Sequence, residues 1–154
     1  MDINSTRRQL HEILDADLRS IPYLDGVNNH MGSLLTRHPG HMAWLMSELR
    51  RRGGLFFVDS YTTPASVALQ MAREAGVPAT RRDVFLDTDP SIDAIEKEFE
   101  RLKALARKHG DAVAIGHPYD ETLDYLERAL PRLRAEGIEL VSVSDVIHRQ
   151  NNAR

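Results

Sequence analysis

Apolar positions along the chain alternate between helical spacing and short apolar runs. Spacings of three and four residues predict helices over residues 6–20, 39–52, 64–75, 91–109, from about 121 to a kink at 131, and 144–148. Short apolar runs predict strands at residues 26–28, 55–58, 84–86, 112–115 and 139–143. Strands that alternate with helices favour βαβ units with parallel pairing and right-handed crossovers, so the predicted fold class is α/β. The pattern alone does not distinguish an open sheet from a sector of a barrel.

Composition and charge narrow the class of protein. The chain has 154 residues, which is enough for about one domain. With 20 Lys and Arg against 23 Asp and Glu, the net charge is −3, which argues against a nucleic-acid-binding protein. The absence of cysteine excludes disulfides, thiolate metal sites and cysteine nucleophiles. The longest apolar runs are too short to span a bilayer, and the first eight residues lack the apolar stretch of a signal peptide.

Polar side chains follow the predicted strands, where parallel α/β proteins form their sites. In chain order the residues after the strands, or around the third of them, are Asn28, Asn29, His30, Asp59, Ser60, Arg82, Asp83, Asp87, His117, Ser142 and Ser144. We expect the side chains from separate strand ends to converge on one rim, as an active site with several residues requires.

The histidines and Asp59 each have a structural and a functional interpretation. His30 and His117 could be satisfied by backbone hydrogen bonds, yet histidine is also a common metal ligand and general acid or base. Asp59 directly follows four apolar residues, so it could be a ligand, a general base, an orienter of a histidine or the first polar residue of a loop.

The other strand-end residues also have both a structural and a functional interpretation. Asn28 and Asn29 could form a turn, or their amides could hold a ligand. Arg82 and Asp83 could be an exposed ion pair of little energetic value, or an arginine that orients a catalytic carboxylate.

Four sequence blocks, taken together, resemble the divergent polysaccharide deacetylase family. They are GVNNHMGS at 26–33, FFVDS at 56–60, RDVFLD at 82–87 and IGHPY at 115–119, and the resemblance extends from about residue 8 to residue 147. It implies a partial irregular (β/α) barrel with a divalent metal, expected to be zinc, at the carboxyl ends of the strands. It also implies a hydrolase of carbohydrate metabolism that removes acetyl groups from a polysaccharide or oligosaccharide.

The same resemblance suggests roles for individual residues. His117 would protonate the leaving group, and Asp59 would supply an orienting or ligating carboxylate. His30 would lie at the metal or at the substrate rim, with metal binding as its expected role, and Arg82 and Asp83 would support the site. The substrate-binding residues would be Asn28, Asn29 and Ser60.

The chain also departs from the pattern of that family. Deacetylases of this type begin with a strand that ends in an Asp-Asp pair, and members of this family then carry a further histidine-bearing strand end; the chain contains neither. We therefore expect residues 1–154 to form a single, N-terminally incomplete domain whose missing metal ligands come from elsewhere. Exposed sheet edges would then favour association with a partner or a second copy. The resemblance implies a periplasmic or exported protein.

Two alternatives to a metal-assisted deacetylase remain. The chain could be a catalytically inactive remnant or a carbohydrate-binding or structural module. It could also be a phosphotransferase with Asp59 as the nucleophile, although Tyr61 stands where such sites usually carry a second acid.

Overall fold

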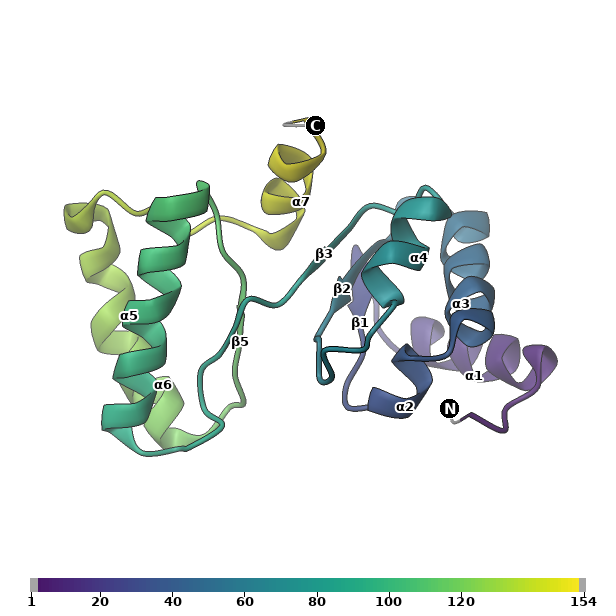
Figure 1. The fold of residues 1–154 in the computed structure, drawn as a ribbon, viewed down its shortest axis with the longest axis horizontal. Coiled ribbons are helices and arrows are strands. Elements are labelled where there is room, and N and C mark those ends of the chain that lie inside the picture. Colours follow the sequence, from purple (N-terminus) through teal and green to yellow (C-terminus); the bar gives the residue numbers. More distant parts are fainter. Residues whose placement is uncertain (1–2, 153–154) are drawn as a thin grey trace. The chain divides into compact units, whose positions relative to one another are not determined.

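The computed structural model describes residues 3–152, and the chain divides into two compact units, Met1–Arg81 (unit 1) and Arg82–Arg154 (unit 2) (Figure 1). Both units combine helices with parallel strands, which confirms the predicted α/β class. Neither sheet is closed, because one has three strands and the other has two. Among residues 3–152, no helix combines the length and apolar character needed to cross a bilayer.

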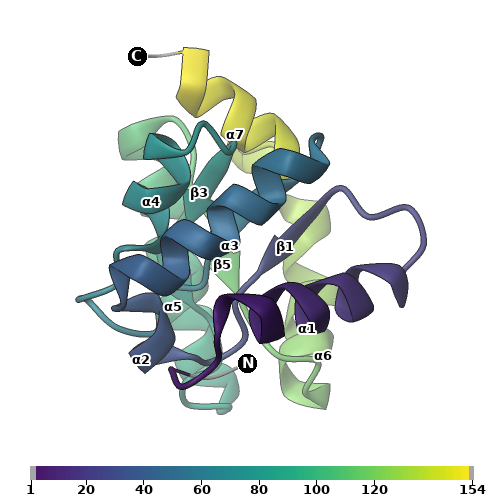
Figure 2. The ribbon, with the colours of Figure 1, turned by 90° about the vertical axis from the view of Figure 1, so that its right-hand side faces the viewer.

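Unit 1 contains a three-stranded parallel sheet with the strand order β1-β2-β3. Its elements are α1 (Arg7–Arg19), β1 (Gly26–Asn28), α2 (Ser33–Thr36), α3 (Pro39–Arg52), β2 (Phe56–Asp59), α4 (Ala68–Glu74) and β3 (Ala79–Arg81). Figure 2 shows α1 and α3 in front of this sheet. An apolar core joins the helices to β2, and its buried residues are Leu14, Met42, Leu45, Met46, Leu49, Phe57, Ala68, Ala72, Val77 and Ala79.

Local sequence signals explain where the helices of unit 1 begin and end. The Oγ1 of Thr6 accepts a hydrogen bond from the Gln9 amide, and the Gln9 side chain accepts one from the Thr6 amide at 2.8 Å. This reciprocal capping box begins α1 where the sequence predicts it. Pro39 begins α3, since its missing N–H is not needed in the first turn, and Gly53 ends this helix with a φ of 71°.

A charged network ties α1 to α3. The Oε2 of Glu48 accepts hydrogen bonds from Arg51 at 2.9 Å and Arg52 at 2.8 Å, and lies 3.0 Å from Nδ1 of His11. Arg52 also binds Asp15 on α1 at 3.1 Å. Burial by itself raises the pKa of Glu48, but the hydrogen bonds from Arg51, His11 and Arg52 outweigh it and hold the pKa at about 2.

The lowered pKa of Glu48 predicts that this network loses strength in acid. The ordinary pKa is 4.5, so its stabilising effect is complete above that pH and is lost as the pH falls towards 2. The free energy of unfolding of the wild type should therefore fall between pH 6 and pH 2 by about 1–2 kcal/mol more than that of Glu48→Gln, a range that allows for solvent screening of the charges. Urea titrations of the wild type and the variant between pH 6 and pH 2 measure this. Glu12→Gln, which changes an exposed glutamate of α1, is the control, and equal pH dependence in all three proteins would contradict the prediction.

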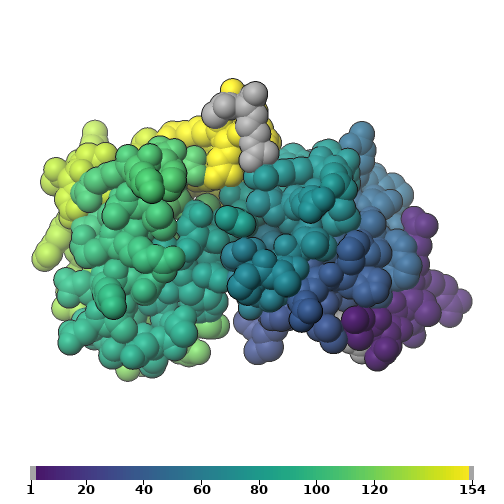
Figure 3. Space-filling view, viewed as in Figure 1, coloured from purple at the N-terminus to yellow at the C-terminus, as the bar shows by residue number. Residues whose placement is uncertain are grey.

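Over residues 82–152, unit 2 contains two parallel strands and four helices, one of them a 3-10 helix. Its elements are β4 (Val84–Phe85), α5 (Ile92–His109), β5 (Ala114–Ile115), α6 (Asp120–Ala129), the 3-10 helix η1 (Leu130–Glu136) and α7 (Val143–Asn152). Figure 3 shows α5 on the visible face of this unit. The core contains Val84, Leu86, Phe99 and Leu133. The change from α6 to η1 next to Pro131 is the predicted break in that helix.

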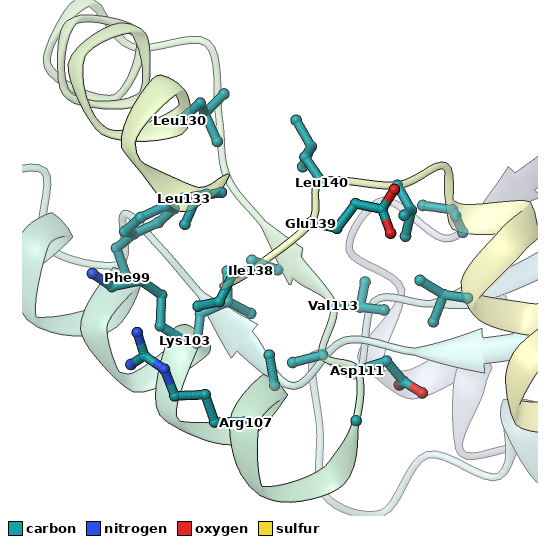
Figure 4. Close-up of a pocket in the computed structure, with 18 of the residues that line it drawn as sticks. Phe99, Lys103, Arg107, Asp111, Val113, Leu130, Leu133, Ile138, Glu139 and Leu140 are labelled. Atoms are coloured by element: carbon teal, nitrogen blue, oxygen red, sulfur yellow. The ribbon is translucent and has the colours of Figure 1, made fainter. Parts of the chain in front are cut away.

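A cavity of about 560 Å³ lies within unit 2, between α5, η1 and the segment that precedes β5. Figure 4 shows Leu133 and Ile138 among its apolar lining, with the charged side chains of Lys103 and Arg107 contributed by α5. Hydrogen bonds that the Lys103 ammonium donates to the carboxylates of Glu100 and Glu136 raise the pKa of Lys103. Residues 110–114 and Leu86 also line the cavity, whereas Asp87 and His117 do not.

Two sequence-based predictions about elements are wrong, and one strand was not predicted. Residues 139–143 do not form a strand; instead α7 begins at Val143, where the Oγ of Ser142 accepts a hydrogen bond from the Asp145 amide at 3.2 Å. The helix predicted from Pro64 begins only at Ala68, because the Ser66 amide binds the Thr63 carbonyl and holds the preceding residues in a turn. Strand β3 was not predicted, since its short sequence lacks an apolar run.

Candidate functional site

A histidine and a carboxylate meet at the carboxyl ends of β4 and β5. Strand β4 pairs with β5 in parallel, with Phe85 opposite Ile115, so the residues that follow the two strands come together. Nδ1 of His117 lies 3.1 Å from Oδ1 of Asp87. The side chain of Asp87 is completely buried, whereas that of His117 is 35% exposed. This pair resembles the orienting contact that a buried carboxylate makes with a catalytic imidazole.

Further hydrogen bonds fix the Asp87 carboxylate. Its Oδ2 accepts hydrogen bonds from the hydroxyl of Thr122 at 3.0 Å and from the backbone amide of His117. Gly116 allows this close approach, because a Cβ at that position would lie 3.2 Å from the same oxygen. Pro118 restricts His117 to an extended backbone. The carboxylate can therefore hold the tautomer in which Nδ1 carries a proton and Nε2 exchanges one.

Arg82 and Asp83 lie at the amino end of β4. Oδ2 of Asp83 accepts a hydrogen bond from the Val113 amide at 2.9 Å, and the Asp83 amide donates to the Val113 carbonyl. The guanidinium of Arg82 lies over the ring of Phe85, 5.0 Å from its centroid. Asp83 thus ties the beginnings of the two strands together, while His117 and Asp87 follow their ends.

In unit 1, the structure brings Asn28, Asn29 and Ser60 together at the carboxyl ends of β1 and β2. Oδ1 of Asn29 accepts a hydrogen bond from the Ser60 amide at 2.8 Å, and the Asn28 amide donates to the Ser60 hydroxyl at 3.3 Å. The Asn29 amide also donates to the carbonyl of Met31, which has a positive φ of 57°. The two asparagines therefore shape this loop, and the exposed Asn28 remains accessible to a ligand.

Asp59 is buried and bound by its own loop. Its Oδ1 accepts a hydrogen bond from the Tyr61 amide at 2.8 Å, and its Oδ2 accepts one from the Ser66 hydroxyl at 2.8 Å. Tyr61 has a positive φ of 49°, a conformation that the contact with Asp59 helps to hold. The carboxylate thus anchors residues 60–66, which carry Ser60.

His30 is exposed in the loop after β1. Within residues 3–152, no three His, Asp or Glu side chains gather closely enough to hold a metal ion. The described residues therefore do not fit a metal site by themselves, and the role of His30 as a ligand stays a prediction. Because each unit is defined separately, convergence of all the strand-end residues on one rim also stays a prediction.

Sequence reasoning identified His117 but gave no role to two residues that position it. Asp87 was one of the polar residues after the third predicted strand. The available signal was that this strand and the strand before His117 were both expected in parallel pairing, which brings residues after their carboxyl ends together. Thr122 gave no signal, because its contact with Asp87 joins residues 35 positions apart.

Comparisons with known proteins relate most of the chain to one family. The family model for divergent polysaccharide deacetylase matches residues 1–147. An uncharacterized protein of Haemophilus influenzae is 41% identical over 121 residues, which are 79% of this chain and 42% of that protein. The uncharacterized protein YibQ of Escherichia coli K12 is 34% identical over 140 residues, which are 91% of this chain and 43% of YibQ.

A solved structure supports the fold. The crystal structure of an uncharacterized protein from Agrobacterium tumefaciens C58 is similar, with a TM-score of 0.84 and 23% sequence identity. The similarity covers 93% of this chain and 58% of that one. The chain thus spans less than half the length of the two curated relatives and just over half of the solved chain.

Proposed function

Because this chain belongs to the divergent polysaccharide deacetylase family, we propose that it supplies the proton-transfer residues of a hydrolase that removes acetyl groups from a glycan. The observation that carries the proposal is the 3.1 Å contact between the half-exposed ring of His117 and the buried carboxylate of Asp87. We further propose that its strands are part of an irregular (β/α) barrel that other polypeptide completes.

The reaction needs a proton at the leaving group. When water adds to the acetyl carbonyl, the C–N or C–O bond to the sugar can break only if the departing nitrogen or oxygen gains a proton. Nε2 of a charged His117 ring donates that proton while Asp87 keeps Nδ1–H in place. Since proton transfer by a positioned side chain typically contributes about 10²–10⁴-fold, His117 accounts for part of the rate.

The residues of unit 1 take substrate-side roles in this proposal. The exposed amide of Asn28 binds sugar hydroxyls, while Asn29 and Ser60 hold the loop beside it. Asp59 acts by anchoring that loop, and Arg82 and Asp83 support unit 2. The described residues do not form a donor set for a metal. Metal analysis of the purified protein tests the expectation of zinc.

Replacing His117 tests the proposal. We expect His117→Gln to lower the rate of acetate release from N-acetylated chito-oligosaccharides by about 100-fold or more, because glutamine cannot transfer the proton. The assay uses the longest natural polypeptide that contains this chain, with added divalent metal. His109→Gln, at the exposed end of α5, is the matched control and should retain the wild-type rate.

The outcomes separate the competing functions. Equal rates for His117→Gln and the wild type would remove His117 from the chemistry. Glycan binding by the wild type without any acetate release, on N- or O-acetylated substrates, would favour a carbohydrate-binding module instead.

A further inference from the structure

Two aromatic rings lie close to the imidazole of His117. The centroid of the Tyr119 ring lies 5.0 Å from that of His117, with 31° between the ring planes. The Phe85 ring lies 5.4 Å from His117 at 42°. Phe85 is half-buried, but Tyr119 is 46% exposed, so its outer surface is open to a ligand beside the imidazole.

Leu123 extends this exposed apolar surface. It lies one helical turn after Tyr119, and its amide donates to the Tyr119 carbonyl at 2.9 Å. Tyr119 is the N-cap of α6 and Leu123 lies in the first turns of that helix, so the Leu123 side chain, which is 51% exposed, adds apolar surface close to Tyr119 in the chain. Single exposed apolar residues are common, but Tyr119 adjoins an oriented histidine.

The charges nearby limit which ligand fits. Asp120 and Glu121 form the acidic first turn of α6, directly after Tyr119. These carboxylates accept hydrogen bonds from hydroxyl or ammonium groups and repel anions. Beside Tyr119, a ligand with an apolar face and a neutral or cationic polar edge therefore matches the surface best, whereas the positive charge of Arg82 lies over the other ring, Phe85.

We propose that Tyr119 and Leu123 form a platform on which the apolar face of a neutral or amino-sugar pyranose packs, so that its acetyl group lies near His117. This inference rests on the proposed role of His117. The C–H groups on one face of a pyranose match an aromatic ring, and the tyrosine hydroxyl provides a polar end that can remain in contact with water. Tyr119 thus binds substrate, whereas His117 transfers the proton.

Oligosaccharide titrations test the platform. We expect Tyr119→Ala to weaken binding of chitotetraose and of its N-acetylated form about 3- to 10-fold, the effect of losing one aromatic contact. Tyr119→Phe should stay within about 2-fold of the wild type, because the ring face is kept. Tyr23→Ala is the matched control, since Tyr23 is fully exposed in unit 1 and should not affect binding. Polygalacturonate fragments, which are anionic, should bind more weakly than either neutral or amino-sugar probe.

A second variant and a second readout keep the test decisive. Leu123→Gln removes the other half of the platform and should also weaken binding. The second readout is the ¹⁵N NMR shifts of the His117 ring, which report whether a variant changes the imidazole itself. If Tyr119→Ala lowers acetate release but leaves oligosaccharide affinity unchanged, Tyr119 acts only by packing against His117, and the platform is overturned. Absence of binding to all the probes by the wild type would also overturn it.

The binding test is independent of catalysis. Weakened binding in Tyr119→Ala without acetate release from any protein would retain the platform and reject the hydrolase. Normal binding in Tyr119→Ala, together with acetate release that requires His117, would retain the hydrolase and reject the platform.

Discussion

Asp87→Asn is expected to leave unit 2 folded while reversing the tautomer of His117. The asparagine carbonyl can occupy the position of Oδ2, where it still accepts the hydrogen bonds from Thr122 and the His117 amide. The new NH₂ group then faces Nδ1 of His117 in place of the carboxylate oxygen. Because an amide NH₂ only donates, Nδ1 must become the acceptor, and the proton moves to Nε2.

The effect on the reaction should far exceed the effect on stability. In the serine protease triad, the corresponding aspartate-to-asparagine change lowers kcat about 10⁴-fold by imposing the wrong tautomer, so a loss of about 10²–10⁴-fold in acetate release is expected here. The ¹⁵N shifts of the two ring nitrogens report the tautomer directly. Asp111→Asn is the control, because Asp111 binds only the Gln150 side chain among the contacts described for it.

Two results would contradict this account of Asp87. Unchanged ¹⁵N shifts in Asp87→Asn would mean that the carboxylate does not set the tautomer. Reversed shifts with an unchanged rate would mean that the tautomer does not matter to catalysis. Loss of folding in the variant would instead assign Asp87 a mainly structural role.

The helices were the most predictable part of the fold because their signals are local. The capping box of Thr6 and Gln9, Pro39 at a helix start, and Gly110 after the last turn of α5 are each read within a few residues. Strands depend on distant partners. Residues 139–143 have the composition of a strand, but the polar bonds of Ser142 favour a helix start there.

The candidate site shows the same difference between features with local sequence signals and features that depend on distant residues. His117 could be found from its place after an apolar run and before a proline. Its pairing with Asp87 depends on the register of β4 against β5, which joins residues 30 positions apart and leaves no local trace. The sequence left several roles open for Asp59, and the hydrogen bond from Ser66 favours one of them, the anchoring of a loop.

Asp59→Ala should destabilise unit 1 strongly. The buried carboxylate accepts hydrogen bonds from the Tyr61 amide and the Ser66 hydroxyl, and both donors would lose their charged acceptor. Since such bonds contribute about 1.5–3 kcal/mol each and do not add fully, we expect a loss of about 2–4 kcal/mol in the free energy of unfolding. Urea denaturation measures it, and Asp17→Ala on the exposed face of α1 should change it by less than about 0.5 kcal/mol.

Asp59→Asn separates a structural role from a chemical one. Its carbonyl can replace one oxygen, but its NH₂ group must then face a donor, either the Tyr61 amide or the Ser66 hydroxyl. The hydroxyl can rotate to accept a hydrogen bond whereas the amide cannot, so the asparagine carbonyl should face Tyr61 and the variant should lose only about 1 kcal/mol. If Asp59 anchors the loop, acetate release should follow the stability of the three proteins in the order wild type, Asn, Ala. An asparagine variant of nearly wild-type stability that has lost all activity would instead show that the carboxylate takes part in the reaction.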